Sequence, residues 1–154
     1  MTGFNRQKKI VMNKVSVIAI LIMLSSFFVA AEVTAQGKTS HKVLMQLSSS
    51  DTLAWKGLMN NIKNMKATWG DSVAIEVVVH GPGIGLLMKE KTNQLDMIID
   101  FKSKGVVFNV CENTLADRKI SKESIIPEAG FVKSAVVEII LKQEQGWTYI
   151  KSGF

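Results

Sequence analysis

Short apolar, β-branched runs alternate with amphipathic stretches of helical period along most of this chain. Runs rich in Val, Ile and Leu predict strands at residues 42–47, 73–79, 106–110, 130–132 and 147–151. Apolar side chains that recur every three or four residues predict helices at residues 52–68, 93–103, 112–119 and 132–143, with a short one at 84–90. This order predicts an α/β fold, with a mostly parallel sheet covered by helices on both faces.

The helical period also predicts which side chains face the core. In residues 52–68 and just beyond, the apolar positions that share one face are Ala54, Leu58, Ile62, Met65 and Trp69. In residues 93–103 the side chains expected to share a face are Leu95, Ile98, Ile99 and Lys102. Between the first strand and helix, residues 48–51 read Ser-Ser-Ser-Asp, a segment typical of a helix cap.

The N-terminal 35 residues have the layout of a cleavable secretory signal. Four basic residues precede residues 15–31, which carry no charge and are mostly apolar. Val33 and Ala35 then occupy the −3 and −1 positions of a cleavage site, and Ala31 offers an alternative. An uncleaved anchor is the competing interpretation, but the apolar run is short for a membrane span. We expect residues 1–35 to be removed, 36–40 to form a short tail and 41–154 to form one domain in the periplasm, with full secretion left open.

Charge and composition exclude several classes of function. Half of the net charge of +6 lies in residues 1–35, and the rest of the chain has neither a basic run nor a basic patch interleaved with aromatics. We therefore expect no nucleic-acid partner, and no membrane association once the signal is cleaved. His41 and His80 are the only histidines and Cys111 is the only cysteine, so we expect no metal, no cofactor and no disulfide within the chain.

In an open parallel sheet, a binding or catalytic site is expected beyond the carboxyl ends of the strands. Three strand ends can be read from the sequence, and each is followed by polar or small residues. They are residues 48–51 with Ser49, residues 80–83 with His80, Gly81 and Gly83, and residues 111–114 with Cys111, Asn113 and Thr114. If the strands are all parallel, these groups share one edge and can enclose a small pocket.

Cys111 is the strongest candidate for a reactive group. It lies between a predicted strand and a predicted helix, where the helix N-terminus favours a thiolate. Arg118 and Lys119 could strengthen this effect, and Glu112 opposes it. Two other roles stay open: a small buried hydrophobic residue, or a bridge between two chains.

The other candidates also have structural alternatives. His80 could orient or deprotonate Cys111, or donate to a bound anion, or it could be an ordinary loop histidine. Residues 81–85 allow close backbone approach, but they lack the ending of a phosphate loop and also fit a plain turn. Glu76 stands in an apolar strand, where an unpaired charge is costly, so we expect it at a sheet edge, at a subunit contact or in an ion pair.

Four segments together resemble the DsrE/DsrF-like family, in particular an exported subgroup with a single cysteine. They are residues 60–64, 76–83, 111–115 and 143–151, within a resemblance that covers about 41–151. The resemblance implies a three-layer α/β/α fold with a five-stranded parallel sheet and assembly into trimers or hexamers. It also implies a persulfide on Cys111, with His80, Asn113 and Thr114 at recurrent positions around it. Its known sulfur-relay members are cytoplasmic, so the export signal argues against a transfer-RNA partner.

Two functions of different classes follow. The first is a sulfur carrier, in which Cys111 takes sulfane sulfur from a donor, holds it as a persulfide and passes it on. His80 would assist proton transfer, and Asn113, Thr114, Gly81, Gly83 and Ser49 would line the ligand site. The second is a non-catalytic binding or oligomeric scaffold module. The sequence leaves open whether the protein is an enzyme, and which donor and acceptor it uses.

Overall fold

The computed structural model describes residues 41–153, which form an α/β domain around one five-stranded sheet. The predicted signal peptide, its cleavage site and the short tail lie outside the described residues. The strands are β1 (His41–Leu47), β2 (Val73–Val79), β3 (Val107–Cys111), β4 (Gly130–Val132) and β5 (Thr148–Ser152). The α-helices are α2 (Thr52–Trp69), α3 (Leu95–Ser103), α4 (Glu112–Asp117) and α5 (Ala135–Glu144). Shorter 3₁₀ segments are η1 (Gly70–Ser72), η2 (Gly81–Leu87) and η3 (Lys122–Ser124).

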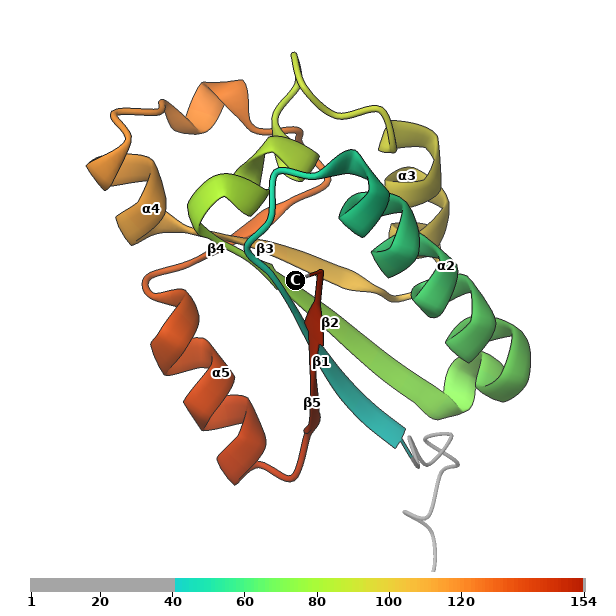
Figure 1. Ribbon diagram of the computed structural model, residues 1–154. Coiled ribbons are helices and arrows are strands. Elements are labelled where there is room, and N and C mark those ends of the chain that lie inside the picture. The colour runs from blue at the N-terminus through green and yellow to red at the C-terminus, as the bar shows by residue number, and fades with distance from the viewer. Residues whose placement is uncertain (1–40, 154) are drawn as a thin grey trace, which may run out of the picture. The chain divides into compact units, whose positions relative to one another are not determined.

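All neighbouring strands pair in parallel, in the order β4-β3-β2-β1-β5. Helices α2 and α3 cover one face of the sheet and α5 covers the other, which gives the predicted three layers (Figure 1). Because the strands are all parallel, the residues that follow β1, β2 and β3 lie along one edge. The sequence-based prediction of α/β class and strand order along the chain is confirmed.

Most element boundaries lie within two residues of those predicted from the sequence, and two elements differ by more. The segment after β2 forms η2 from Gly81 to Leu87, so the helix predicted at 84–90 begins earlier and includes the predicted break. Helix α5 begins at Ala135, three residues after the predicted start, because residues 130–132 are held in β4 beside β3. No helix among residues 41–153 is long and apolar enough to cross a membrane.

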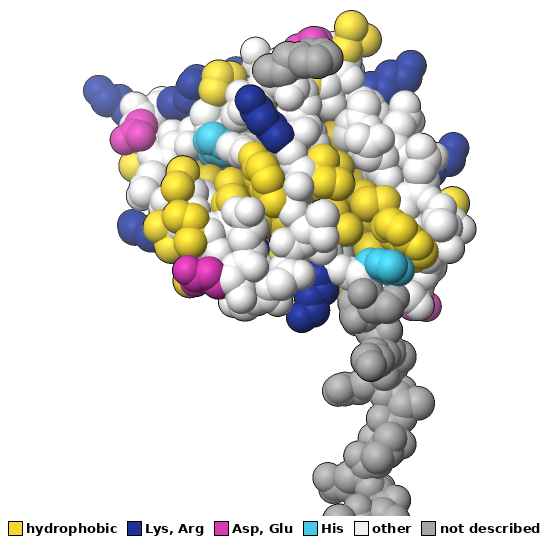
Figure 2. All heavy atoms as spheres, turned by 60° about the horizontal axis from the view of Figure 1, so that its bottom comes forward, with side chains coloured by type: hydrophobic (Ala, Val, Ile, Leu, Met, Phe, Trp, Pro, Cys, Tyr) yellow, Lys and Arg dark blue, Asp and Glu magenta, His cyan; other side chains and the backbone are white. Residues whose placement is uncertain are grey.

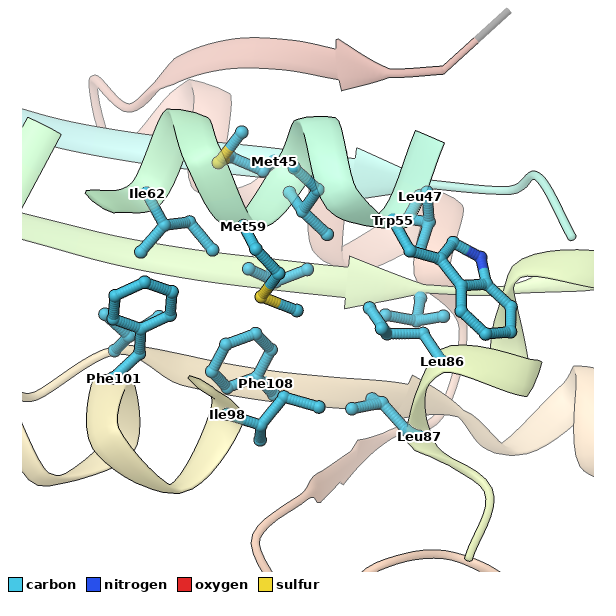
Figure 3. Close-up of a cluster of buried hydrophobic side chains, with 14 of the residues drawn as sticks. Met45, Leu47, Trp55, Met59, Ile62, Leu86, Leu87, Ile98, Phe101 and Phe108 are labelled. Atoms are coloured by element: carbon cyan, nitrogen blue, oxygen red, sulfur yellow. The ribbon is translucent and has the colours of Figure 1, made fainter. Parts of the chain in front are cut away.

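The larger core lies between the sheet and the layer of α2 and α3 (Figure 3). Its members come from alternate positions of β1, β2 and β3 and from α2, α3 and η2, and include Met45, Met59, Leu86, Ile98 and Phe108. Asp51 caps the N-terminus of α2, and its carboxylate accepts the N–H of Leu53 at 2.8 Å. This is the cap that residues 48–51 predict.

The predicted buried faces of α2 and α3 were partly wrong. In α2 the fully buried side chains are Trp55, Leu58, Met59 and Ile62, whereas Trp69 is 37% exposed and stacks on His41. In α3 the buried side chains are Ile98 and Phe101, while Leu95 and Ile99 are exposed. Both helices keep the expected period, but their buried stripe is rotated, because the period does not specify which flank of an apolar stripe meets the sheet.

Two adjacent isoleucines in α3 provide a matched test of this packing. Ile98 is completely buried and Ile99 is 46% exposed. We expect Ile98→Ala to lower the free energy of unfolding by about 2–5 kcal/mol, because it removes core contacts and leaves a cavity. Ile99→Ala should change it by less than about 0.5 kcal/mol. Urea unfolding of both variants checks this, and equal losses would contradict the observed rotation of α3.

Candidate functional site

Cys111 is the last residue of β3 and the N-cap residue of α4. Its side chain is 5% exposed and packs against Leu44, Val78 and Ala135 on the α5 face of the sheet. It is the free cysteine of the described residues. The placement at a strand end and a helix start is the one that the sequence predicts.

The N-terminus of α5 also points at this sulfur. Ala135, the first residue of α5, donates its backbone N–H to Cys111 Sγ at 3.3 Å. The N-cap residue Ser134 makes no side-chain capping hydrogen bond. The cysteine sulfur therefore accepts one of the N–H groups that the first turn of a helix leaves without an intrahelical partner. The sequence does not reveal this contact, because the two residues belong to different elements.

Hydrogen bonds give the Cys111 thiol a pKa below its ordinary value. Burial by itself raises the pKa, because it disfavours the charged thiolate. The backbone N–H groups of Thr114, Ala135 and Asn113 and the Thr114 hydroxyl lower it, and their combined effect is larger. The expected help from Arg118 and Lys119 is not among these causes, and Arg118 instead lines a separate cavity of about 150 Å³ with Trp55 and Lys91.

Thr114 connects the thiol to the loop after β2. Its hydroxyl accepts the N–H of Gly81 at 3.1 Å and also hydrogen-bonds to Cys111. Gly81 has a positive φ of 52°, a conformation that favours glycine. Asn113 is exposed, and its backbone N–H reaches the carbonyl of Lys133 at 3.2 Å. Cys111, Asn113, Thr114 and Gly81 are thus brought together, as predicted.

His80 follows β2 and lies half-buried on the same face. Its Nε2 is 2.5 Å from the side-chain amide nitrogen of Gln46, and burial lowers the pKa of the imidazole. Because Val79 pairs with Val110, His80 and Cys111 stand at the carboxyl ends of neighbouring strands. No hydrogen bond among the described residues joins their side chains, so direct deprotonation of Cys111 by His80 has no contact to support it here.

Two predicted ligand residues have structural roles instead. Ser49 Oγ accepts the N–H of Asp51 at 3.1 Å, and its carbonyl accepts the indole N–H of Trp55 at 2.8 Å, so Ser49 organises the start of α2. At Gly83 an added Cβ would lie 2.7 Å from the carbonyl oxygen of Leu47. The close approach expected for this glycine is therefore an approach to the backbone of β1.

Glu76 is buried in the central strand β2, not at an edge, and its charge is paired. Lys142 of α5 lies 2.6 Å from its carboxylate, and the amide of Asn109 donates to it at 3.0 Å. The ammonium of Lys142 also lies over the ring of Trp147. Of the three expectations for Glu76, the ion pair is the one observed, and it ties the C-terminal half of α5 to the sheet.

Sequence reasoning missed Gln46 and Tyr149. Tyr149 donates its hydroxyl to Gln46 Oε1, and Gln46 in turn contacts His80. A glutamine inside the otherwise apolar run of residues 43–47 was a visible signal. The contact with Tyr149 had no such signal, because it depends on β5 lying beside β1. Within residues 41–153, no three His, Cys, Asp or Glu side chains lie close enough together to hold a metal ion.

Comparisons with known proteins agree with this geometry. The model of the DsrE/DsrF-like family matches residues 29–152. The chain belongs to the DsrE/DsrF-like family. Members of this family generally take part in sulfur relay. The match covers every described strand and helix, including the segment around Cys111.

Eight chains of solved structures resemble this chain, among them the following two. One is a protein of unknown function, MTH1491 from Methanobacterium thermoautotrophicum, at 27% identity and a TM-score of 0.68, covering 72% of this chain and 98% of that one. The other is a conserved protein of unknown function, BT1422 from Bacteroides thetaiotaomicron, at 12% identity and a TM-score of 0.60, covering 76% and 99%. The second likeness shows the fold alone. A comparison with curated proteins finds no match.

Removing the Thr114 hydroxyl tests the electrostatics of the thiol. We expect Thr114→Val to raise the pKa of Cys111, because a hydrogen bond that favours the thiolate is lost. The rate of alkylation by iodoacetamide should then rise with pH along a curve displaced to higher pH than in the wild type. Thr148→Val, on exposed β5, is the matched control and should leave the curve unchanged. An undisplaced curve for Thr114→Val would show that the hydroxyl does not stabilise the thiolate.

Proposed function

We propose that the protein carries sulfane sulfur as a persulfide on Cys111. The observation that supports this most directly is the set of N–H and O–H donors around the sulfur, which lowers the pKa of the thiol. A larger thiolate fraction makes a cysteine a better nucleophile near neutral pH. Membership of the DsrE/DsrF-like family supports the same chemistry. Cys111 is 5% exposed, so we expect small sulfur donors.

The loading step balances without an added oxidant or reductant. The Cys111 thiolate attacks the outer sulfur of a donor such as thiosulfate, a new S–S bond forms, and the S–S bond of the donor breaks. The electron pair of that bond leaves with sulfite, and the protein keeps a negatively charged persulfide. An acceptor thiolate then attacks the outer sulfur and regenerates the Cys111 thiolate. Donors aimed at the sulfur, such as the Ala135 N–H, stabilise the anionic states.

Replacement of the cysteine tests the proposal. After incubation with polysulfide or thiosulfate, we expect intact-mass spectrometry to show one added sulfur atom on the wild type and none on Cys111→Ser, because serine offers no thiolate. A reductant should remove the added sulfur. Ser134→Ala is the matched control beside the thiol, and it should still load because the Ala135 N–H is a backbone group. Loading of Cys111→Ser would rule out Cys111 as the carrier.

The burial of Cys111 supports the alternative function, a non-catalytic binding or scaffold module. Its sulfur packs against Leu44 and Val78 and is nearly enclosed, as in cysteines that serve as small core residues. A thiol that resists alkylation until the protein unfolds, with no sulfur loaded, would favour this alternative over the carrier.

We also propose that the protein is exported to the periplasm by the signal in residues 1–35, and that it assembles into trimers or hexamers. Exposed apolar side chains on α5 support assembly: Val136, Val137, Ile140 and Leu141 are 45–59% exposed. On the face shown in Figure 2, hydrophobic side chains are exposed at several places among polar groups. A contiguous patch of exposed apolar side chains often marks a protein–protein contact.

A charge placed on α5 tests the assembly. We expect size-exclusion chromatography with light scattering to show an oligomer for the wild type and a smaller species for Ile140→Asp, because a carboxylate would be desolvated in an apolar contact. Gln143→Asp puts the same charge on an exposed polar position of α5 and should keep the oligomer. A monomeric wild type at high concentration would contradict the assembly.

A further inference from the structure

Three side chains, from β5, from β1 and from the residue that follows β2, form a hydrogen-bonded row on the α5 face of the sheet. Tyr149 of β5 donates to Gln46 Oε1, and Gln46 Nε2 lies 2.5 Å from His80 Nε2. Tyr149 pairs in register with Leu44, and Gln46 pairs with Val78. Each step of the row therefore moves one strand across and two residues toward the carboxyl edge. The row ends at His80, beside the strand that carries Cys111.

The chemistry of the amide gives this row a direction. Gln46 Oε1 can only accept a hydrogen bond, so the Tyr149 hydroxyl beside it is the donor. The other end, Nε2, can only donate, so His80 Nε2 must receive with its lone pair. An imidazole whose Nε2 carries a lone pair is neutral and has its proton on Nδ1. A protonated imidazolium has no lone pair on either nitrogen and would lose the contact with Gln46.

We propose that Gln46, oriented by Tyr149, is a positioning residue that holds His80 as the neutral imidazole with its proton on Nδ1. Nε2 is then occupied, and Nδ1–H is left as the group that can donate. This inference rests on the proposed sulfur-carrier function, and it assigns His80 the role of donating a hydrogen bond from Nδ1–H to the anionic sulfur of Cys111 or to the bound sulfur donor. His80 does not act as the base that removes the thiol proton. Of the roles that the sequence left open, donation to an anion is the one selected.

Burial also favours the neutral imidazole, since it lowers the pKa of His80 by disfavouring the cation. The other titratable groups that the sheet and α5 place on this face are Lys42, Glu76, Cys111, Glu138, Lys142, Tyr149 and Lys151. Glu76 and Glu138 are both paired with Lys142. Lys142 therefore balances the charge of both carboxylates, and Gln46 is the side chain that hydrogen-bonds to the His80 ring.

Long-range ¹H–¹⁵N NMR of the labelled protein reads the tautomer directly. In the wild type at neutral pH we expect His80 to be neutral and protonated at Nδ1, with the His41 signals as an internal reference. Tyr149→Phe removes the group that orients the amide, and it should convert His80 to a mixture of tautomers. A wild-type His80 that is protonated at Nε2, or charged at neutral pH, would overturn the inference. The wild-type spectrum decides even if a variant does not fold.

Gln46→Glu is the complementary variant. A carboxylate in place of the amide accepts a hydrogen bond from Nε2–H and favours the cation, so His80 should titrate about one pH unit or more higher than in the wild type. Gln145→Glu adds the same charge at an exposed position beyond α5 and should leave the titration unchanged. Identical titrations of Gln46→Glu and the wild type would overturn the role of Gln46. These readouts need no sulfur, so failure of sulfur loading leaves them interpretable.

Discussion

Parallel pairing of β1, β2 and β3 places the residues that follow these strands along one edge, and the candidate site depends on this pairing. The register of Val79 with Val110 puts His80 beside Cys111. The same geometry lets the Gly81 N–H reach the Thr114 hydroxyl, which locks the loop after β2 to the first turn of α4. Each crossover runs back over a face of the sheet, so the helices also begin at this edge. Helix α5 begins there, and its Ala135 N–H donates to the sulfur of Cys111.

The two faces of the sheet differ in chemistry. The face under α2 and α3 is a continuous apolar core, whereas the face under α5 combines a small apolar cluster with buried polar contacts. There Glu76 is paired with Lys142, and Gln46 joins Tyr149 to His80. Removing one partner of a buried ion pair is far more costly than the net stabilisation the pair provides. The pair joins the C-terminal half of α5 to β2, and at the other end of the same helix the Ala135 N–H donates to Cys111.

Neutral hydrogen-bond donors, and not cations, lower the pKa of the Cys111 thiol. Backbone N–H groups and one hydroxyl stabilise the thiolate, while Lys122 is paired with the adjacent carboxylate of Glu112. Donors fixed by the backbone do not reorganise when charge develops on the sulfur. They are also screened less by salt than exposed cations are. A neutral His80 fits this pattern, because it adds a donor to the edge without adding a charge.

The sequence by itself determined the order of the elements, the parallel α/β class and the position of Cys111 between β3 and α4. These follow from local patterns, since the period of apolar residues and the β-branched runs lie within single elements. Only the tertiary structure decided that Trp55 and Met59 face the core in place of Trp69. It also decided that Ser49 makes hydrogen bonds at the start of α2 and that Gly83 packs closely against the backbone of β1. It also decided the contact of Gln46 with Tyr149, 103 residues away. That contact needs β5 beside β1, and strand order in space is set by packing of the whole sheet, which leaves no local signal in the chain.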